Sequence, residues 1–283
     1  MLSLIVICVC AVRIFPNSEK PDDYPGFPEK ADTVISARYE HAVALFNEHD
    51  DTGEALEEAR QEFLSILSID PHHAPSLSYL GFIKLDDNNT TSADSLFTLA
   101  LASDSTCPEA HVGRAQMFRQ RLQWQKGYDE AHLAVKLAPS SSLARWELVN
   151  ELIHRAEAPV TDSVANEAIP HLKKLIELNT NDRDAHLNLA ELYEHKMWLS
   201  DAAKQYREVL RIGQTSDDMD VWVYTVHLDA ARCYEQIGEY EKAIEELKGY
   251  LEVIKEYNMD DEVRKIEDRI RNLESKTDDD TIK

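Results

Sequence analysis

The chain has 283 residues, which is enough for one large domain or two ordinary ones, and 43% of them are hydrophobic. Its 8 glycines and 10 prolines are few, whereas Ala, Leu and Glu are frequent, so the composition favours long helices over sheet. The formal net charge of −23 would repel phosphate backbones and anionic membrane surfaces, so we expect no nucleic-acid partner; the acidity serves either a solvated outer face or the attraction of basic partners.

An apolar segment opens the chain. Residues 2–12 are uncharged and, apart from one serine, apolar. The run is too short for a transmembrane helix but suits the core of a signal peptide, with cleavage expected after Ala11. No Lys or Arg precedes it, and no bacterial lipobox leads to Cys8 or Cys10. We expect residues 1–12 to be a signal peptide or membrane anchor, and the protein to be exported or membrane-anchored (cell envelope or secretory pathway); a cytoplasmic protein with an apolar end is the alternative.

A proline-rich linker is expected over residues 13–32. Its stretch PNSEKPDDYPGFPEK carries four prolines and a glycine, which disfavour both helix and strand. We expect it to act as a spacer between the N-terminal segment and the folded part.

A pattern then recurs six times, with variations. Each instance has a small residue, an apolar residue four positions later, another three after that, and a turn residue five further on. The instances begin at Ala59, Ala93, Gly127, Ala168, Ala202 and Ala243. Their separations are 34, 34, 41, 34 and 41 residues, so three match a 34-residue helix-pair repeat and two exceed it by seven.

A partner helix is indicated upstream of most of these small residues. It reads Leu77-x-x-Leu80-Gly81, Glu109-x-x-Val112-Gly113, His186-x-x-Leu189-Ala190-x-x-Tyr193 and His227-x-x-Ala230-Ala231-x-x-Tyr234. Together with A-x-x-x-F on the second helix, this resembles the tetratricopeptide-repeat (TPR) signature W-x-x-L-G-x-x-Y over about residues 33–257. The resemblance implies an all-α, right-handed superhelical solenoid of about six helix pairs, in which each pair buries its core against its neighbours.

The third and fourth pairs depart from the pattern. The third has a longer turn between its helices, around Gln123 to Lys126. The fourth has Asn150 where a small residue is preferred, and an insertion from Ala156 to Ser163. We expect the helix pairing to be least regular there.

A final helix is predicted after the sixth pair. Apolar residues recur there at helical spacing: Val263, Ile266, Ile270 and Leu273. We expect this helix to cap the stack, so that the solenoid covers residues 33–275 and residues 276–283 form a disordered acidic tail.

Signals for chemistry are weak. His72 and His73 fall in a predicted turn without further ligands at chelating spacing, and none of the 4 cysteines forms a CxxC pair. His186 and His227 stand where the TPR family often has Trp, so we expect them to pack at the core edge with a hydrogen bond. No phosphate loop, GxSxG elbow or HExxH helix occurs. We expect no catalytic residue, metal or cofactor; a hydrolase or metalloenzyme with an unrecognised site is an alternative.

The TPR resemblance also implies where a partner would bind. In that family the first helices line the concave face and hold an extended peptide or a helix. Carried over by position, this stripe comprises Ser78, Phe82, Leu85, Ala110, Arg114, Met117, Leu187, Glu191, Glu194, Leu228, Arg232 and Glu235. TPR co-chaperones clamp an acidic tail with basic side chains on this face, whereas the stripe here is mixed or acidic.

The sequence therefore predicts a non-catalytic scaffold or assembly adaptor that binds other proteins and is tethered or exported through its N-terminus. Its mechanism would be geometric, because a rigid solenoid presents many weak contacts in fixed register. A soluble intracellular co-chaperone-like regulator is the alternative.

Overall fold

A computed structural model describes residues 29–48, 53–154, 160–213 and 224–281. The predicted segment 1–12 and the linker up to residue 28 lie outside the described residues, and residues 29–32, expected as linker, begin the first helix. The described part holds thirteen helices and no strand, which confirms the all-α prediction. The helices are α1 (Glu29–Asn47), α2 (Glu54–Ile69), α3 (Ala74–Asp86), α4 (Thr90–Ser103), α5 (Pro108–Gln120), α6 (Trp124–Leu137), α7 (Ser142–His154), α8 (Asp162–Leu178), α9 (Arg183–His195), α10 (Leu199–Gly213), α11 (Val226–Gln236), α12 (Tyr240–Glu256) and α13 (Asp260–Thr281).

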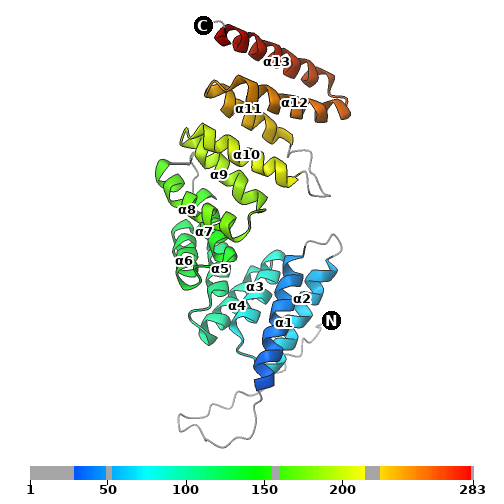
Figure 1. Ribbon diagram of the computed structural model, residues 1–283. Helices are drawn as coiled ribbons and strands as arrows, with labels where there is room; N and C mark the ends of the chain where they lie inside the picture. Colours follow the sequence, from blue (N-terminus) through cyan, green and yellow to red (C-terminus); the bar gives the residue numbers. More distant parts are fainter. Residues whose placement is uncertain (1–28, 49–52, 155–159, 214–223, 282–283) are drawn as a thin grey trace, which may run out of the picture.

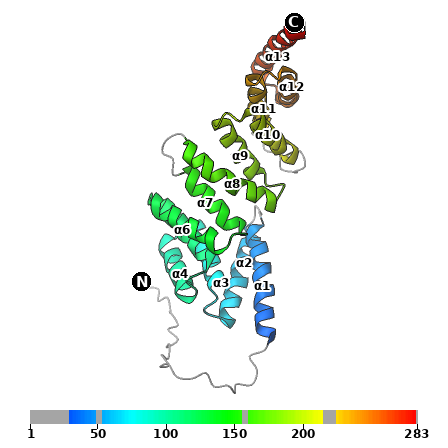
Figure 2. The ribbon, with the colours of Figure 1, turned by 60° about the vertical axis from the view of Figure 1, so that its left-hand side comes forward.

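The helices pair in chain order and the pairs stack from one end of the molecule to the other (Figures 1 and 2). α1 pairs with α2, α3 with α4 and so on to α11 with α12, and α13 covers the last pair. The prediction of six helix pairs and a capping helix is confirmed. Among the described helices, none has both the length and the apolarity that crossing a membrane requires.

The second helix of each pair buries the residues that define the repeat. The small residues at its point of closest approach are all buried: Ala59, Ala93, Gly127, Ala168, Ala202 and Ala243. Four positions later, five of the six pairs carry a large side chain that is at most 2% exposed: Phe63, Phe97, Leu172, Tyr206 and Leu247. Burying such a side chain contributes about 1.5–3 kcal/mol, so these positions hold the stack together. The third pair differs, because it has Ala131 there.

The first helix of the third pair has a different register from the predicted one. In the second, fifth and sixth pairs, the small residue of the first helix lies twelve positions before that of the second helix. The same count back from Gly127 leads to Ala115, which is fully buried, and not to Gly113. His111 then takes the place assigned to Glu109. The predicted alignment of this helix is corrected by two residues.

The fourth pair also differs from the prediction. Val149, which is fully buried, occupies the position of closest approach, and Asn150 lies beside it and is partly exposed. The insertion falls at the connection between α7 and α8, where residues 155–159 lie outside the described part. The pair therefore packs through a valine, and the asparagine does not interrupt it.

Gly81 and Gly113 both lie against the aromatic ring of Phe97. A Cβ atom at Gly81 would lie 2.5 Å from the ring of Phe97, and a Cβ atom at Gly113 would lie 2.1 Å from it. The ring from α4 thus fits between α3 and α5 because both helices lack a side chain where they face it. The two glycines and the phenylalanine form one steric unit that joins the second pair to the third.

The capping helix is longer than predicted. Three of its apolar residues are buried against the sixth pair: Ile266, Ile270 and Leu273. The helix continues to Thr281, so residues 276–281 are helical and not part of a disordered tail over 276–283. The ammonium group of Lys276 lies 5.6 Å from the ring centre of Tyr240 in α12. This contact favours a helix that runs past residue 275.

Replacing Gly113 by alanine tests the steric unit. In an open helix this change ordinarily adds about 1 kcal/mol of stability, because alanine has the higher helix propensity. Here the added methyl group collides with the ring of Phe97. We expect Gly113→Ala to lower the free energy of unfolding by about 1–3 kcal/mol, measured by urea denaturation followed by circular dichroism.

The control is the same change in a Phe97→Ala background, where the space left by the ring accepts the methyl group. In that background Gly113→Ala should be neutral or stabilising. An equal loss of stability in both backgrounds would contradict the steric explanation.

Candidate protein-interaction surface

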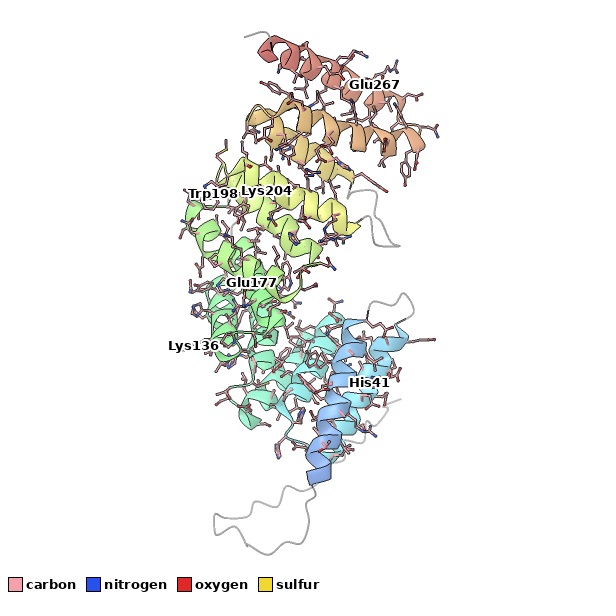
Figure 3. All side chains as sticks on the ribbon, viewed as in Figure 1. His41, Lys136, Glu177, Trp198, Lys204 and Glu267 are labelled. Atoms are coloured by element: carbon pink, nitrogen blue, oxygen red, sulfur yellow. The ribbon has the colours of Figure 1, made fainter. Side chains whose placement is uncertain are left out.

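The first helices lie on the inner side of the curved stack. α3 packs against α5 and α5 against α7, whereas the second helices α4, α6 and α8 pack against the first helix of the following pair. The second helices carry exposed charged side chains, for example Lys136, Glu177 and Lys204 (Figure 3), and single exposed apolar ones such as Leu99 and Leu178. We take the inner face, where the predicted stripe lies, as the candidate binding surface.

The N-terminal half of the predicted inner stripe is buried. Five of its residues are at most 6% exposed: Ser78, Phe82, Leu85, Ala110 and Met117. α3 and α5 pack closely at this point, and the rings of Phe46 from α1 and Phe97 from α4 lie 6.2 Å and 5.5 Å from that of Phe82. The expectation that these five residues line an open groove is therefore corrected, because they belong to the core.

The sixth residue of that half, Arg114, remains partly exposed and pairs with Glu130 at 3.2 Å. In the corrected register, the inner positions of α5 are Val112, Gln116 and Arg119. Gln116 and Arg119 both contact Glu147 of α7, at 3.1 Å and 3.3 Å. The two-residue shift hid this link from the sequence prediction.

The C-terminal half of the stripe is accessible. Its members are all partly or fully exposed: Leu187, Glu191, Glu194, Leu228, Arg232 and Glu235. Arg232 donates from Nε and Nη2 to the two oxygens of Glu194, both at 2.9 Å, and pairs with Asp229 at 2.8 Å. Glu235 pairs with Arg269 of α13 at 2.7 Å. These ion pairs tie α9, α11 and α13 together along the inner face.

A hollow of about 500 Å³ opens between α9 and α11. We call it the acidic hollow, and its lining is Glu191, Glu194, His195, Met197, Tyr206, Asp229, Arg232 and Gln236. Partial burial raises the pKa of Glu191, and the carboxylates of Asp229 and Glu194 raise it further. Burial also raises the pKa of Asp229, although Arg232 opposes this. Three carboxylates thus face one guanidinium, which leaves an excess of negative charge.

Five residues of the acidic hollow were missed by the sequence prediction, and two of them, Asp229 and Tyr206, bind its charged side chains; the other three are His195, Met197 and Gln236. Asp229 follows the stripe residue Leu228 and is tilted toward Arg232. Tyr206 comes from the second helix of its pair, and its hydroxyl donates to Glu194 at 3.0 Å. A position count along the first helices finds neither, although the charge of Asp229 beside Arg232 three residues later is a signal for an i, i+3 ion pair.

The two stripe arginines do not form a cationic clamp. Arg114 is on α5 and pairs with Glu130 of its own helix pair, whereas Arg232 is on α11 and pairs with Glu194 and Asp229. Each guanidinium is neutralised within the protein. The arrangement does not suit the capture of an acidic tail.

The histidine turn has a structural role. His73 is the N-cap of α3, where its Nδ1 accepts from the backbone N–H of Ser76 at 3.3 Å. In the described part of the chain, no three His, Cys, Asp or Glu side chains gather as a metal site would require. Cys107 and Cys233 are both buried and free, and burial raises their pKa to about 11 and about 12.

Three further histidines, His111, His186 and His227, form a recurring polar pair. His111 Nδ1 lies 2.6 Å from Glu130, and the histidines of the fifth and sixth pairs repeat this contact with the residue nineteen positions later. Their contacts are His186 with Gln205 at 2.7 Å and His227 with Glu246 at 2.8 Å. The expected packing of these two histidines with a hydrogen bond is confirmed.

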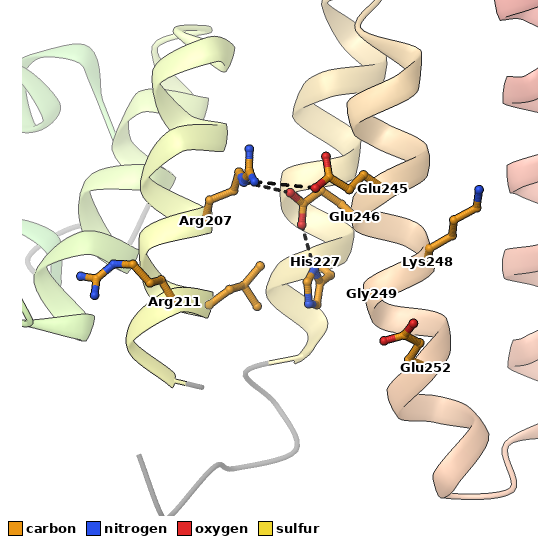
Figure 4. A pocket seen from close by; sticks show the side chains of 9 residues that line it. Arg207, Arg211, His227, Glu245, Glu246, Lys248, Gly249 and Glu252 are labelled. Carbon is orange, nitrogen blue, oxygen red and sulfur yellow. Dashed lines mark hydrogen bonds and ion pairs between the residues drawn. The ribbon is translucent and has the colours of Figure 1, made fainter. Parts of the chain in front are cut away.

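The same position is polar in two further pairs, where Arg38 contacts Glu62 at 3.1 Å and Arg145 contacts His171 at 3.2 Å. In the sixth pair, Arg207 of α10 joins His227 in binding Glu246, at 3.3 Å (Figure 4). Glu246 is 4% exposed and is satisfied by both partners. The contact of Arg207 with Glu246 joins the fifth pair to the sixth, and the other contacts link the two helices of one pair.

Comparisons with known proteins agree with this fold. No protein-family model matches the chain. Superkiller protein 3 of Schizosaccharomyces pombe is 24% identical over 223 residues, which make up 78% of this chain. The chain spans 15% of the length of that relative, so the alignment covers a small part of a longer protein.

Solved structures are similar over most of the chain. PilF of Pseudomonas aeruginosa matches with a TM-score of 0.58 and 17% identity, covering 85% of this chain and 100% of that one. YrrB, a TPR protein with an unusual peptide-binding site, matches with a TM-score of 0.53 and 18% identity over 68% and 91% of the two chains. MamA matches with a TM-score of 0.51 and 18% identity, covering 64% of this chain and 92% of that one. The chain therefore has the fold of a TPR solenoid.

The pair of His111 and Glu130 should make stability depend on pH. The hydrogen bond to Glu130 raises the pKa of His111, although burial opposes it. A raised histidine pKa adds stability that is complete below about pH 6.5 and is lost as the pH rises through the folded-state value. We expect Glu130→Gln to cost on the order of 1 kcal/mol more at about pH 6 than at about pH 9, measured by thermal denaturation. The variant loses the ion pair with Arg114 at both pH values, so this loss cancels when the two costs are subtracted.

The fifth pair provides the converse test, because Gln205 occupies the place of Glu130 beside His186. Gln205→Glu should stabilise the protein more at the lower pH than at the higher. If Glu130→Gln costs the same at both pH values, the charged form of His111 does not contribute.

Proposed function

We propose that this protein is a non-catalytic interaction scaffold whose inner face, over the fifth and sixth helix pairs, binds a segment of a partner protein. The observation that supports this proposal is the acidic hollow. It is accessible, it lies on the inner face, and its side chains come from both neighbouring pairs. YrrB, which shares the fold, is a TPR protein with an unusual peptide-binding site, which supports a peptide-binding role for this protein.

The chemistry of the hollow favours a basic partner segment. Glu191, Glu194 and Asp229 contribute three carboxylates, of which Arg232 compensates one. A lysine or arginine of a bound segment would supply the missing positive charge. Leu187 and Leu228 are partly exposed on the same helices, so apolar side chains of that segment would pack beside it.

Two wider aspects of the function extend this proposal. The apolar residues 1–12 support a protein that is exported or anchored in a membrane and that assembles its partner there. The alternative, an intracellular co-chaperone-like regulator, would need a cationic inner face to hold an acidic tail. The described inner face is acidic in its accessible half, which favours the adaptor.

The proposal predicts charge-selective peptide binding. We would measure the fluorescence anisotropy of two labelled peptides of equal length, one alternating Leu with Lys and Arg, the other alternating Leu with Glu and Asp. The full chain should bind the basic peptide and not the acidic one. Glu191→Gln combined with Asp229→Asn should weaken this binding about tenfold, which corresponds to about 1.4 kcal/mol.

General attraction to a chain of net charge −23 must be separated from binding in the hollow. Glu252→Gln combined with Glu256→Gln is the matched control, because it removes two exposed carboxylates from α12, away from the hollow. This variant should bind the basic peptide almost as the unchanged protein does. Equal losses in both variants would refute the proposed site.

A further inference from the structure

The turns that join the two helices of a pair share one backbone geometry. Four pairs have a residue with positive φ just after the cap of the first helix: Asn88 at 57°, Leu122 at 57°, Met197 at 58° and Gly238 at 80°. The backbone N–H of this residue donates to the carbonyl oxygen three positions earlier, at 2.8 to 3.2 Å. This left-handed conformation ends the helix, and it favours glycine or asparagine because other side chains are crowded by their own backbone.

Leu122 and Met197 do not follow this preference. Each of them is 67% exposed, so neither side chain gains stability from burial in the core. The turn around Met197 is nevertheless well fixed, because the N–H of Trp198 donates to the carbonyl oxygen of Tyr193 at 2.8 Å and the two rings lie 5.6 Å apart (Figure 3 labels Trp198). A large apolar side chain is thus held in solvent at a position where the backbone favours glycine.

The acidic hollow gives the side chain at position 197 a place to act. Met197 lines the hollow together with Glu194 of α9 and Gln236 of α11. Leu122 lies in the turn between α5 and α6, two pairs away from the hollow. The two residues have the same backbone geometry and the same exposure, and they differ in whether they border the hollow.

Apolar side chains lie on both sides of the carboxylates along α9. Leu187 is partly exposed, and it shares one face of the helix with Glu191 and Glu194, which follow it at the fourth and seventh positions. Met197 comes after Glu194, beyond the end of the helix. A basic residue that binds these carboxylates would therefore have an apolar surface on either side of it.

We propose that Met197 is a specificity-determining contact of the acidic hollow, which selects partner segments that carry an apolar side chain next to their basic residue. Methionine is unbranched, flexible and polarisable, so it adapts to apolar side chains of different shape. This inference rests on the proposed function, because it assigns a second contact within the same binding site. The carboxylates select the charge of the partner, and Met197 selects the apolar residue beside that charge.

Two basic peptides separate these contacts. They have equal length and charge, and Lys and Arg alternate with Leu in one and with Ser in the other. Their binding to the full chain would be measured by fluorescence anisotropy, and the unchanged protein should bind the Leu peptide more tightly. Met197→Gly should weaken binding of the Leu peptide about three- to tenfold, the loss expected for a contact of one or two methylene groups, and should leave binding of the Ser peptide unchanged.

Leu122→Gly is the matched control, because it makes the same kind of exchange at the same φ and the same exposure. Glycine suits a positive φ, so neither glycine variant should lower the melting temperature. Leu122→Gly should bind both peptides as the unchanged protein does. Met197→Leu should retain most of the affinity for the Leu peptide, since the same turn accepts leucine at position 122.

The outcomes distinguish the role of Met197 from the function on which it rests. Glu191→Gln combined with Asp229→Asn should weaken binding of both peptides, whereas Met197→Gly should weaken binding of the Leu peptide alone. Unchanged binding of the Leu peptide by Met197→Gly, or equal losses in Met197→Gly and Leu122→Gly, would overturn the role of Met197 and leave the hollow as a binding site. Failure of the unchanged protein to bind either peptide would refute both proposals.

Discussion

The solenoid depends on one recurring contact, in which a large side chain from the second helix of a pair fills the space against the first helix of the next. Phe63 stacks on Tyr79 with ring centres 5.0 Å apart, and Phe97 fits against Gly81 and Gly113. The extensive contacts of each pair are with its neighbours in the described stack, so little distant packing can replace a lost contact. The size of this side chain and the space opposite it therefore determine each joint. At the third joint, where the side chain is Ala131, Glu151 of α7 lies against Gly127 one turn earlier.

The spacing between first helices decides which part of the inner face can bind. α3, α5 and α7 pack against one another, and the side chains between them are buried as a core. Beyond α7 the first helices no longer pack as closely, and the same repeat positions become accessible on α9 and α11. A position that is structural in one half of the solenoid is therefore available to a partner in the other half. The acidic hollow lies in that second half, where Tyr206 and Arg232 both contact Glu194.

Polar contacts are distributed according to burial. The pairs of histidine or arginine with a residue of the second helix lie at the edge of each core, where a hydrogen bond satisfies a half-buried side chain. The inner-face carboxylates of the fifth and sixth pairs are partly solvated, so an excess of negative charge is tolerated there. Glu147 and Glu151 are buried on α7, where the guanidinium of Arg119 lies 3.3 Å and 3.7 Å from their carboxyl groups.

The sequence by itself determined the fold class, the six second helices and the capping helix, because small and large residues recur at a spacing that antiparallel helices need. It also placed His186 and His227 at the core edge, since they stand at a repeat position. The register of α5 follows from the twelve-residue spacing between Ala115 and Gly127 in the sequence, but only the tertiary structure showed that Gly113 faces the ring of Phe97. The tertiary structure also decided which stripe residues are buried and which are accessible to a partner. That depends on how closely successive first helices approach, and this distance is set by side chains from three helices at once, which no pattern along a single helix contains.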